Sequence, residues 1–167
     1  MEDDYEAFAA QARYLGHHDA IKPVLTVFEN LAFWAGLYGV AESKVAAAVE
    51  KALAAFALSA LRDIPGIMLS AGQKRRANLA RLLVAPAGVW LLDEPTTALD
   101  KASVAVFEGV IAAHRAAGGM VVLSTHTDIV VADSTELFMT QFAADPAHAA
   151  RQVHFAADLF DDQDTAR

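Results

Sequence analysis

An α/β fold with a parallel sheet is predicted by three segments in the second half of the sequence. The run GVWLLDE, bounded by Gly88 and Pro95, is short and almost wholly apolar, as is typical of a strand buried on both faces. The amphipathic segment KASVAVFEGVIAAHRAAGG follows it, and MVVLSTH then forms a second apolar run. The order strand, helix, strand favours parallel pairing with a right-handed crossover.

The first half of the chain predicts a short strand at residues 13–15 and then helices. Thr26 and Glu29 have the spacing of a capping box, in which side chain and backbone of the first turn bond each other. Together with the Ala-rich segment after Gly39, they predict a helical subdomain at about residues 26–62. Ser70 and Gln73 repeat the spacing and predict a helix at 70–85.

The end of the chain gives weaker signals. The strand expected at 89–93 and the second apolar run come first. TDIVVAD follows, for which we expect a short helix, and then TELFMT, for which we expect a short strand. From residue 143 the pattern fades. We therefore expect one domain at residues 1–142 and a loosely ordered tail at 143–167.

Bulk composition excludes several classes of function. The 167 residues have a formal net charge of −8, which argues against nucleic acid as a partner because phosphates attract basic surfaces. The absence of cysteine excludes disulfides and thiolate metal sites. No apolar stretch reaches the roughly 18 residues of a membrane span, and the N-terminus, MEDDYEAF, is acidic where a signal peptide is basic. These features indicate a cytosolic or peripheral protein.

Two carboxylates, Asp93 and Glu94, come at the end of the buried run VWLLDE. Ligands of open α/β sheets bind outside the carboxyl ends of the strands. A carboxylate there can hold Mg²⁺ through water, and a second one can orient or deprotonate an attacking water. The alternative is structural, with Asp93 capping a turn before Pro95 and Glu94 exposed to solvent.

The segment LSAGQ places Ser70, Ala71, Gly72 and Gln73 at the start of a predicted helix. Free backbone N–H groups and the positive end of the helix dipole attract anions at such a position. Gly72 permits close approach of a ligand to the backbone. Taken alone, the segment is better explained as an ordinary capped helix.

In order along the chain, LSAGQ, VWLLDE, ALD and STHTD resemble the signature motif, Walker B strand, D-loop and switch histidine of ABC transporter ATP-binding subunits. Ala71 replaces the usual first glycine of the signature motif. Asp100 falls in the D-loop and His126 at the switch position. The resemblance covers about residues 13–140 and implies an ABC ATPase core, of the P-loop NTPase class, with a helical subdomain.

A narrower resemblance lies upstream, in YLGHHDAIKPVLTVFENL. It is similar to the Q-loop region of the ATP-binding subunits of cytochrome c biogenesis haem exporters. His17 takes the Q-loop position and His18 follows it, so either histidine can serve that role. A loop pair of histidines without a role is the alternative. The resemblance implies ATP-driven export of haem, or ATP-driven release of a haem-loaded chaperone.

The resemblance also implies cofactors, partners and roles for individual residues. ATP and Mg²⁺ are the expected cofactors, with Asp93 holding the metal through water, Glu94 polarising the attacking water and His126 contacting the γ-phosphate. The partners are a second ATPase subunit, in a head-to-tail dimer, and integral membrane permease subunits. Asp100 couples the two sites across the dimer, and the chain works at the cytoplasmic face of the inner membrane.

One expected motif is absent from the sequence. A phosphate loop reads G-x-x-x-x-G-K-S/T, yet none of the five lysines follows a glycine or precedes Ser or Thr. We therefore expect an incomplete ATPase core, inactive alone, with apolar surface left uncovered and poor solubility. The alternatives are a truncated, non-catalytic module that pairs with a complete ATPase, and a soluble ABC ATPase of DNA repair or translation, which the acidic composition disfavours.

Overall fold

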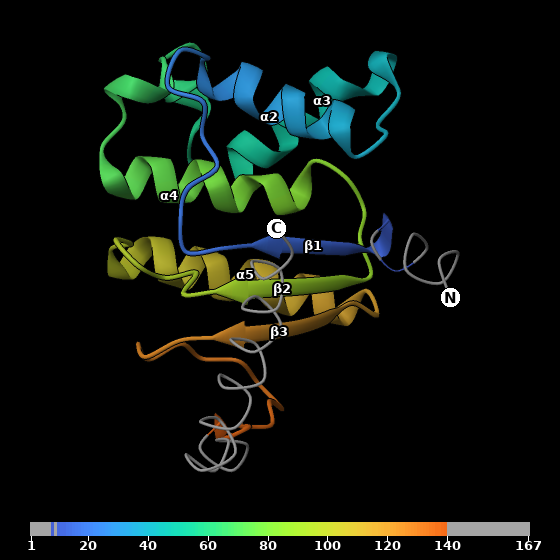
Figure 1. Cartoon of the computed structure of the whole chain (residues 1–167), viewed down its shortest axis with the longest axis vertical. Coiled ribbons are helices and arrows are strands. Elements are labelled where there is room, and N and C mark those ends of the chain that lie inside the picture. The colour runs from blue at the N-terminus through green and yellow to red at the C-terminus, as the bar shows by residue number, and fades with distance from the viewer. Residues whose placement is uncertain (1–7, 9, 140–167) are drawn as a thin grey trace, which may run out of the picture. The chain divides into compact units, whose positions relative to one another are not determined.

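The computed structural model describes residue 8 and residues 10–139, and it contains a parallel three-stranded sheet (Figure 1). The strands are β1 (Ala12–Leu15), β2 (Val89–Asp93) and β3 (Met120–Ser124), in the order β1-β2-β3. The pairing aligns Leu15 with Leu92 and Asp93 with Ser124. The predicted α/β class with a parallel sheet is confirmed.

Helix α5 (Lys101–Ala116) connects β2 to β3 and covers one face of the sheet. Its Phe107 and Ile111 are buried in the same core as Trp90 and Leu92 of β2. Alternation along the strands turns a different set of side chains to the other face. That face is largely open in residues 10–132, since Tyr14 is 64% exposed, Met120 60% and Val122 56%.

Helices α2 (Val27–Leu37), α3 (Glu42–Ala55) and α4 (Ala71–Ala80) pack on one another beside β1 (Figure 1). Both predicted capping boxes are present. The Thr26 hydroxyl accepts from the Glu29 N–H at 3.1 Å while the Glu29 carboxylate accepts from the Thr26 N–H at 2.8 Å. Gly39, at φ +77°, follows the end of α2. Two short 3₁₀ turns lie between α3 and α4, η1 (Ser59–Leu61) and η2 (Gly66–Met68), and a third, η3 (Arg81–Leu83), follows α4.

Three expectations differ from the structure. The helix expected to reach residue 85 ends at Ala80 and continues as the tighter turn η3 to Leu83. Pro86 disfavours helix at Ala85, the residue directly before it. Residues 127–133 are not helical. The Val130 N–H donates to the Glu108 carboxylate at 2.7 Å and not to the backbone carbonyl four residues earlier, as it would in a helix. Residues 135–139 form no strand. The expected tail at 143–167 lies outside the described residues.

Candidate functional site

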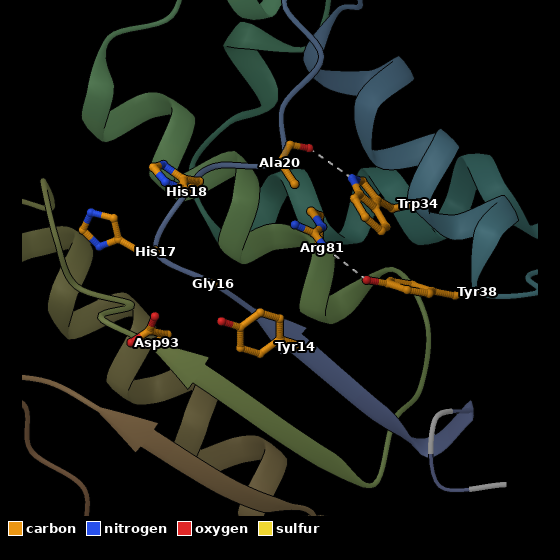
Figure 2. Close-up of a pocket in the computed structure, with 9 residues that line it drawn as sticks. All are labelled: Tyr14, Gly16, His17, His18, Ala20, Trp34, Tyr38, Arg81 and Asp93. Atoms are coloured by element: carbon orange, nitrogen blue, oxygen red, sulfur yellow. Dashed lines mark hydrogen bonds between the residues drawn. The ribbon is translucent and has the colours of Figure 1, made fainter. Parts of the chain in front are cut away.

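The carboxyl ends of the three strands bring the predicted site residues to one edge of the sheet. Parallel pairing requires this, because Asp93 at the end of β2 is in register with Ser124 at the end of β3. The loop after β1 begins with Gly16 and His17, beside the same edge (Figure 2). Segments near residues 16, 93 and 126 thus lie at the same edge although they are far apart in the sequence.

Glu94 and His126 form an ion pair when the imidazole is protonated. Nδ1 of His126 lies 2.8 Å from Oε1 of Glu94, with the Glu94 side chain 14% exposed and the His126 side chain 83% exposed. Oε2 of Glu94 is buried without a hydrogen-bond partner among the described residues. A buried carboxylate oxygen in that state is able to accept a proton or a hydrogen bond from a bound water. The alternative of a solvent-exposed Glu94 is therefore wrong.

The backbone at Glu94 is in the left-handed region, with φ +47°. Few residues other than glycine adopt this conformation, and those that do are held there by their surroundings. The Glu94 N–H is donated to the Ser124 carbonyl at 2.9 Å, which ties the residue to β3. The conformation turns the side chain away from the line of the strand and toward His126.

Asp93 contacts the neighbouring strand through its carboxylate. The Ser124 hydroxyl donates to Oδ1 of Asp93 at 2.6 Å, and no other hydrogen bond to the Asp93 side chain is found among the described residues. The alternative that Asp93 caps a turn before Pro95 has no such bond to support it. One oxygen of the carboxylate remains available for a hydrated cation.

This edge of the sheet offers few protein ligands for a metal ion. No group of three or more His, Cys, Asp or Glu side chains placed to hold a metal is found in the described part of the chain. Mg²⁺ commonly keeps several waters and takes one or two carboxylates plus substrate phosphates. Asp93, with one carboxylate oxygen that has no hydrogen bond from the described residues, fits that pattern.

His17 and His18 follow β1 and line a cavity of about 600 Å³ with Asp93 (Figure 2). Their rings meet edge to face with centroids 5.5 Å apart, and both side chains are exposed. The far wall carries Trp34, Tyr38 and Arg81. Both histidines lie at the site, and which of them takes the Q-loop role stays open.

The predicted signature segment forms the first turn of α4. The Ser70 hydroxyl accepts from the Gln73 N–H at 3.3 Å, and Oε1 of Gln73 accepts from the Ser70 N–H at 2.8 Å. Ala71 is exposed. A side chain at Gly72 would come within 2.9 Å of the Ala98 carbonyl oxygen. The start of α4 therefore lies directly against the loop that follows β2.

Asp100 caps helix α5. Its carboxylate accepts from the Ser103 N–H at 2.7 Å. This backbone hydrogen bond, with smaller contributions from the Ser103 hydroxyl and the charge of Arg76, lowers the pKa of Asp100. Ala98, two residues earlier, has φ +64°. Asp100 thus fixes the end of the loop that begins at Glu94, and it lies apart from the Glu94–His126 pair.

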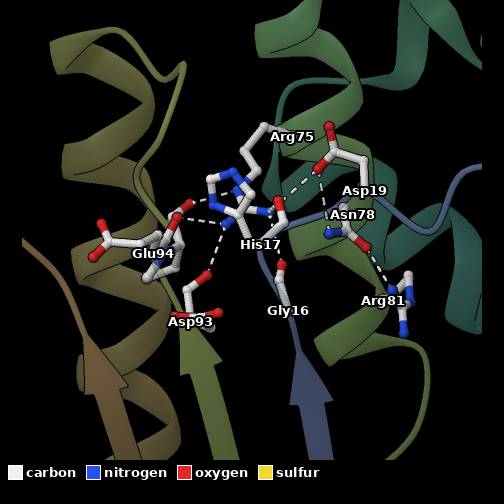
Figure 3. A network of polar contacts seen from close by, with 9 residues as sticks. Gly16, His17, Asp19, Arg75, Asn78, Arg81, Asp93 and Glu94 are labelled. Carbon is white, nitrogen blue, oxygen red and sulfur yellow. Dashed lines mark hydrogen bonds and ion pairs between the residues drawn. The ribbon is translucent and has the colours of Figure 1, made fainter.

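Two residues of the site were not predicted from the sequence. Ser124 bonds Asp93, and its position two residues before His126 was the available signal. Arg75, buried on α4, donates to backbone carbonyls at the ends of β1 and β2 (Figure 3). In the sequence it appears only as one member of the basic cluster that follows LSAGQ.

Comparison with known proteins defines the class. A family model described as ABC transporter matches residues 1–97 of the 167. The chain belongs to the ABC transporter family. A solved structure of the ATP-binding subunit of an ABC transporter has a TM-score of 0.66 and 25% identity, covering 75% of this chain and 52% of that one.

Among curated proteins, the chain is similar to the cytochrome c biogenesis ATP-binding export protein CcmA of Paramagnetospirillum magneticum. Identity is 62% over 143 residues, covering 86% of this chain and 66% of that protein. The protein of the same name from Rhodospirillum rubrum is 61% identical over 147 residues, covering 88% and 61%. The chain spans less than two thirds of the length of these relatives. None of the helices in the described residues has the length and apolar content needed to cross a membrane.

Proposed function

We propose that this chain is the nucleotide-binding part of a transporter ATPase that drives an export step of cytochrome c biogenesis. ATP hydrolysis then drives either the export of haem or the release of a haem-loaded chaperone. The observation that carries the proposal is the group formed by Asp93, Glu94 and His126 at the edge of a parallel sheet, in a chain 62% identical to a cytochrome c biogenesis export ATPase.

The proposed chemistry uses one residue for each task. Bound Mg²⁺ supplies positive charge that neutralises the phosphates. Asp93 would hold the hydrated cation through its free oxygen, and the Ser124 hydroxyl orients the carboxylate. Glu94 accepts a proton from the attacking water at Oε2, while Oε1 is held by His126. His126 contacts the γ-phosphate from its exposed side, and His17 or His18 hydrogen-bonds a water beside Asp93.

The first turn of α4 serves a second nucleotide. In a head-to-tail dimer, Ser70, Ala71, Gly72 and Gln73 face the γ-phosphate bound by the partner subunit, where the free N–H groups of a helix start favour an anion. Ala98 lies against Gly72 of this turn, and Asp100 ends the same loop, which begins at Glu94. Asp100 therefore couples the two sites.

Membrane permease subunits are the proposed partners of the helical region. Phe33 and Leu37 on α2 are 44% and 63% exposed, four residues apart on one face of the helix. This arrangement supports docking of an apolar helix from a permease at the cytoplasmic face of the inner membrane, with the chain peripheral to the bilayer. We also propose that residues 1–142 act as one domain, with the helical subdomain at about 26–62.

A second role is favoured by one observation, the lack of any lysine in a G-x-x-x-x-G-K-S/T context. Backbone N–H groups and a lysine of that loop supply much of the phosphate affinity. Alone, the chain is then inactive. The second candidate function is a non-catalytic module that offers Ser70 and Gly72 to a complete ABC ATPase.

The test is a Glu94→Gln substitution in the chain assembled with its permease and a complete ATPase partner. We expect phosphate release to fall by about 10²–10³-fold while ATP binding is retained, because the amide cannot take the proton. Glu42→Gln, on the exposed start of α3, is the control. Unchanged turnover with Glu94→Gln, but loss with a Gly72→Arg substitution, supports the non-catalytic module. Unchanged turnover in both variants contradicts both roles.

A further inference from the structure

Arg75 joins α4 to the carboxyl ends of β1 and β2, and it is only 2% exposed. Its Nε donates to the Pro95 carbonyl at 3.0 Å, and its Nη2 donates to the carbonyls of Asp93, at 3.1 Å, and Glu94 (Figure 3). The three carbonyls are consecutive and run from the last residue of β2 into the turn that carries the proposed base. A single side chain thus bonds the end of the strand and the start of that turn.

The other side of the guanidinium bonds the loop that follows β1. Nη1 lies 3.2 Å from the Gly16 carbonyl, 3.4 Å from the His17 carbonyl and 3.3 Å from Oδ1 of Asp19. Asp19 also accepts from the Asn78 side chain at 3.3 Å, one turn along α4. Asp19 is the one carboxylate paired with Arg75 in the described residues. A planar guanidinium presents its donors in a fixed fork, so these bonds set the orientation of all three segments at once.

The bond to the Glu94 carbonyl helps to hold a backbone conformation that is unfavourable for a residue other than glycine. Glu94 has φ +47°, and such a residue keeps this conformation only where its neighbours impose it. The Ser124 carbonyl accepts from the Glu94 N–H. The Glu94 carbonyl accepts from both Arg75 and the Thr97 N–H. Loss of the Ser124 or the Arg75 bond lets the peptide rotate and moves the carboxylate away from His126.

A second contact links the same two elements independently. Gly72 lies against the Ala98 carbonyl, and Ala98 also has a positive φ, +64°. The first turn of α4 therefore meets the loop after β2 near both its ends, at residues 93–95 through Arg75 and at residue 98 through Gly72. Because both contacts are direct, a movement of α4 also moves the backbone of Glu94.

We propose that Arg75 is a positioning residue that makes the signature turn of α4 and the Glu94 turn move together. This inference rests on the proposed function, in which α4 senses the nucleotide of the partner subunit and Glu94 acts on the subunit's own. Arg75 then links the occupancy of one site to the geometry of the base in the other. It touches neither nucleotide.

Hydrogen exchange on this chain tests the link without any turnover. The Thr97 and Leu99 amides, bonded to the carbonyls of Glu94 and Thr96, report on the loop. In Arg75→Gln we expect these amides to exchange at least about tenfold faster, with α5 amides such as Val104 unchanged. Arg62→Gln, which removes an exposed ion pair with Glu50, is the control. If Arg75→Gln fails to fold, Asp19→Asn gives a milder perturbation of the same guanidinium. Unchanged protection of the loop overturns the proposal.

ATP hydrolysis by the assembled complex gives the second readout. Arg75→Gln is expected to lower kcat by about 100-fold while changing KM for ATP little, since displacement of a base costs rate and leaves substrate contacts in place. Dependence of the rate on ATP concentration should also lose cooperativity. Arg75→Lys, which keeps the charge without the fork, should recover only part of kcat. If Glu94→Gln abolishes turnover and Arg75→Gln leaves kcat and cooperativity intact, this inference fails alone. If Glu94→Gln also has no effect, the proposed function fails.

Discussion

His114 stacks on Trp90 and is closed in from the other side by the backbone at Gly119. The two rings are 3.7 Å apart between centroids and 4° from parallel. Burial lowers the pKa of His114, and a hydrogen bond with the Met120 backbone raises it by less. The folded chain therefore favours the neutral imidazole, which stacks on an indole without needing a counter-ion.

This environment predicts a pH dependence of stability. Because the pKa of His114 is lower in the folded chain than the value of about 6.5 in the unfolded chain, the unfolded state binds more protons as pH falls. The contribution of His114 is complete above about pH 6.5 and declines below it, down to the folded pKa. Urea unfolding should show a smaller loss of stability on acidification in His114→Phe than in the parent chain. Equal losses in both would contradict this account.

The sequence motifs named candidate site residues, but they did not give the bonding partners of those residues. Glu94 and His126 were placed by motif, and the structure puts them 2.8 Å apart. The Ser124 bond to Asp93 and the bonds of Arg75 depend on how strands and helix pair in three dimensions. A buried arginine and an exposed one look alike in a basic run, so the sequence signal was ambiguous.

Helix α5 returns to β3 through Gly118 and Gly119, where the chain turns tightly. Gly118 has φ +89°, and a side chain at Gly119 would overlap the His114 ring. The ring cannot retreat, because Trp90 stacks on its other face. The turn therefore depends on the lack of a side chain at residue 119.

Gly119→Ala is expected to destabilise the chain by about 1–3 kcal/mol through overpacking. Gly109→Ala is the matched control, since nothing lies within 4 Å of a side chain added there in the middle of α5. That change should raise stability by up to about 1 kcal/mol, because alanine favours helix. Thermal unfolding of both variants measures the difference. A Gly119→Ala variant as stable as the parent would show that the ring moves freely.

Elements with a local signal were predicted well, and elements that depend on tertiary bonds were not. Both capping boxes and β2 follow from short-range patterns and are present. Residues 127–133 have a helix-compatible composition, but their backbone is bonded by side chains of α5, at Glu108 and Arg115. Propensity is overridden there by partners far away in sequence.

At the scale of residues 10–132, the sheet is covered on one face and largely open on the other. Trp90 and Leu92 are buried beneath α5, whereas Tyr14, Met120 and Val122 are exposed on the opposite face. Exposed apolar side chains gathered on a sheet favour association. This arrangement accords with the poor solubility that we expect for the isolated chain.

Val122→Thr should shift the isolated chain toward monomer, because it places a hydroxyl on the open face at nearly constant shape. Val106→Thr, at a 39% exposed position on α5, makes the same chemical change away from that face and should have little effect. Light scattering after gel filtration gives the mass of each species. Equal shifts in both variants would place the association elsewhere.

The two capping boxes share a geometry but differ in charge. At the start of α2 the reciprocal group is the Glu29 carboxylate, and at the start of α4 it is the neutral amide of Gln73. A carboxylate at this position cancels the positive potential of the first turn, whereas an amide leaves it in place. Lys74 adds a further positive charge beside the turn of α4. The same capping box thus begins both helices. The side chain that closes it is a carboxylate at α2, which repels a phosphate, and a neutral amide at α4, which does not.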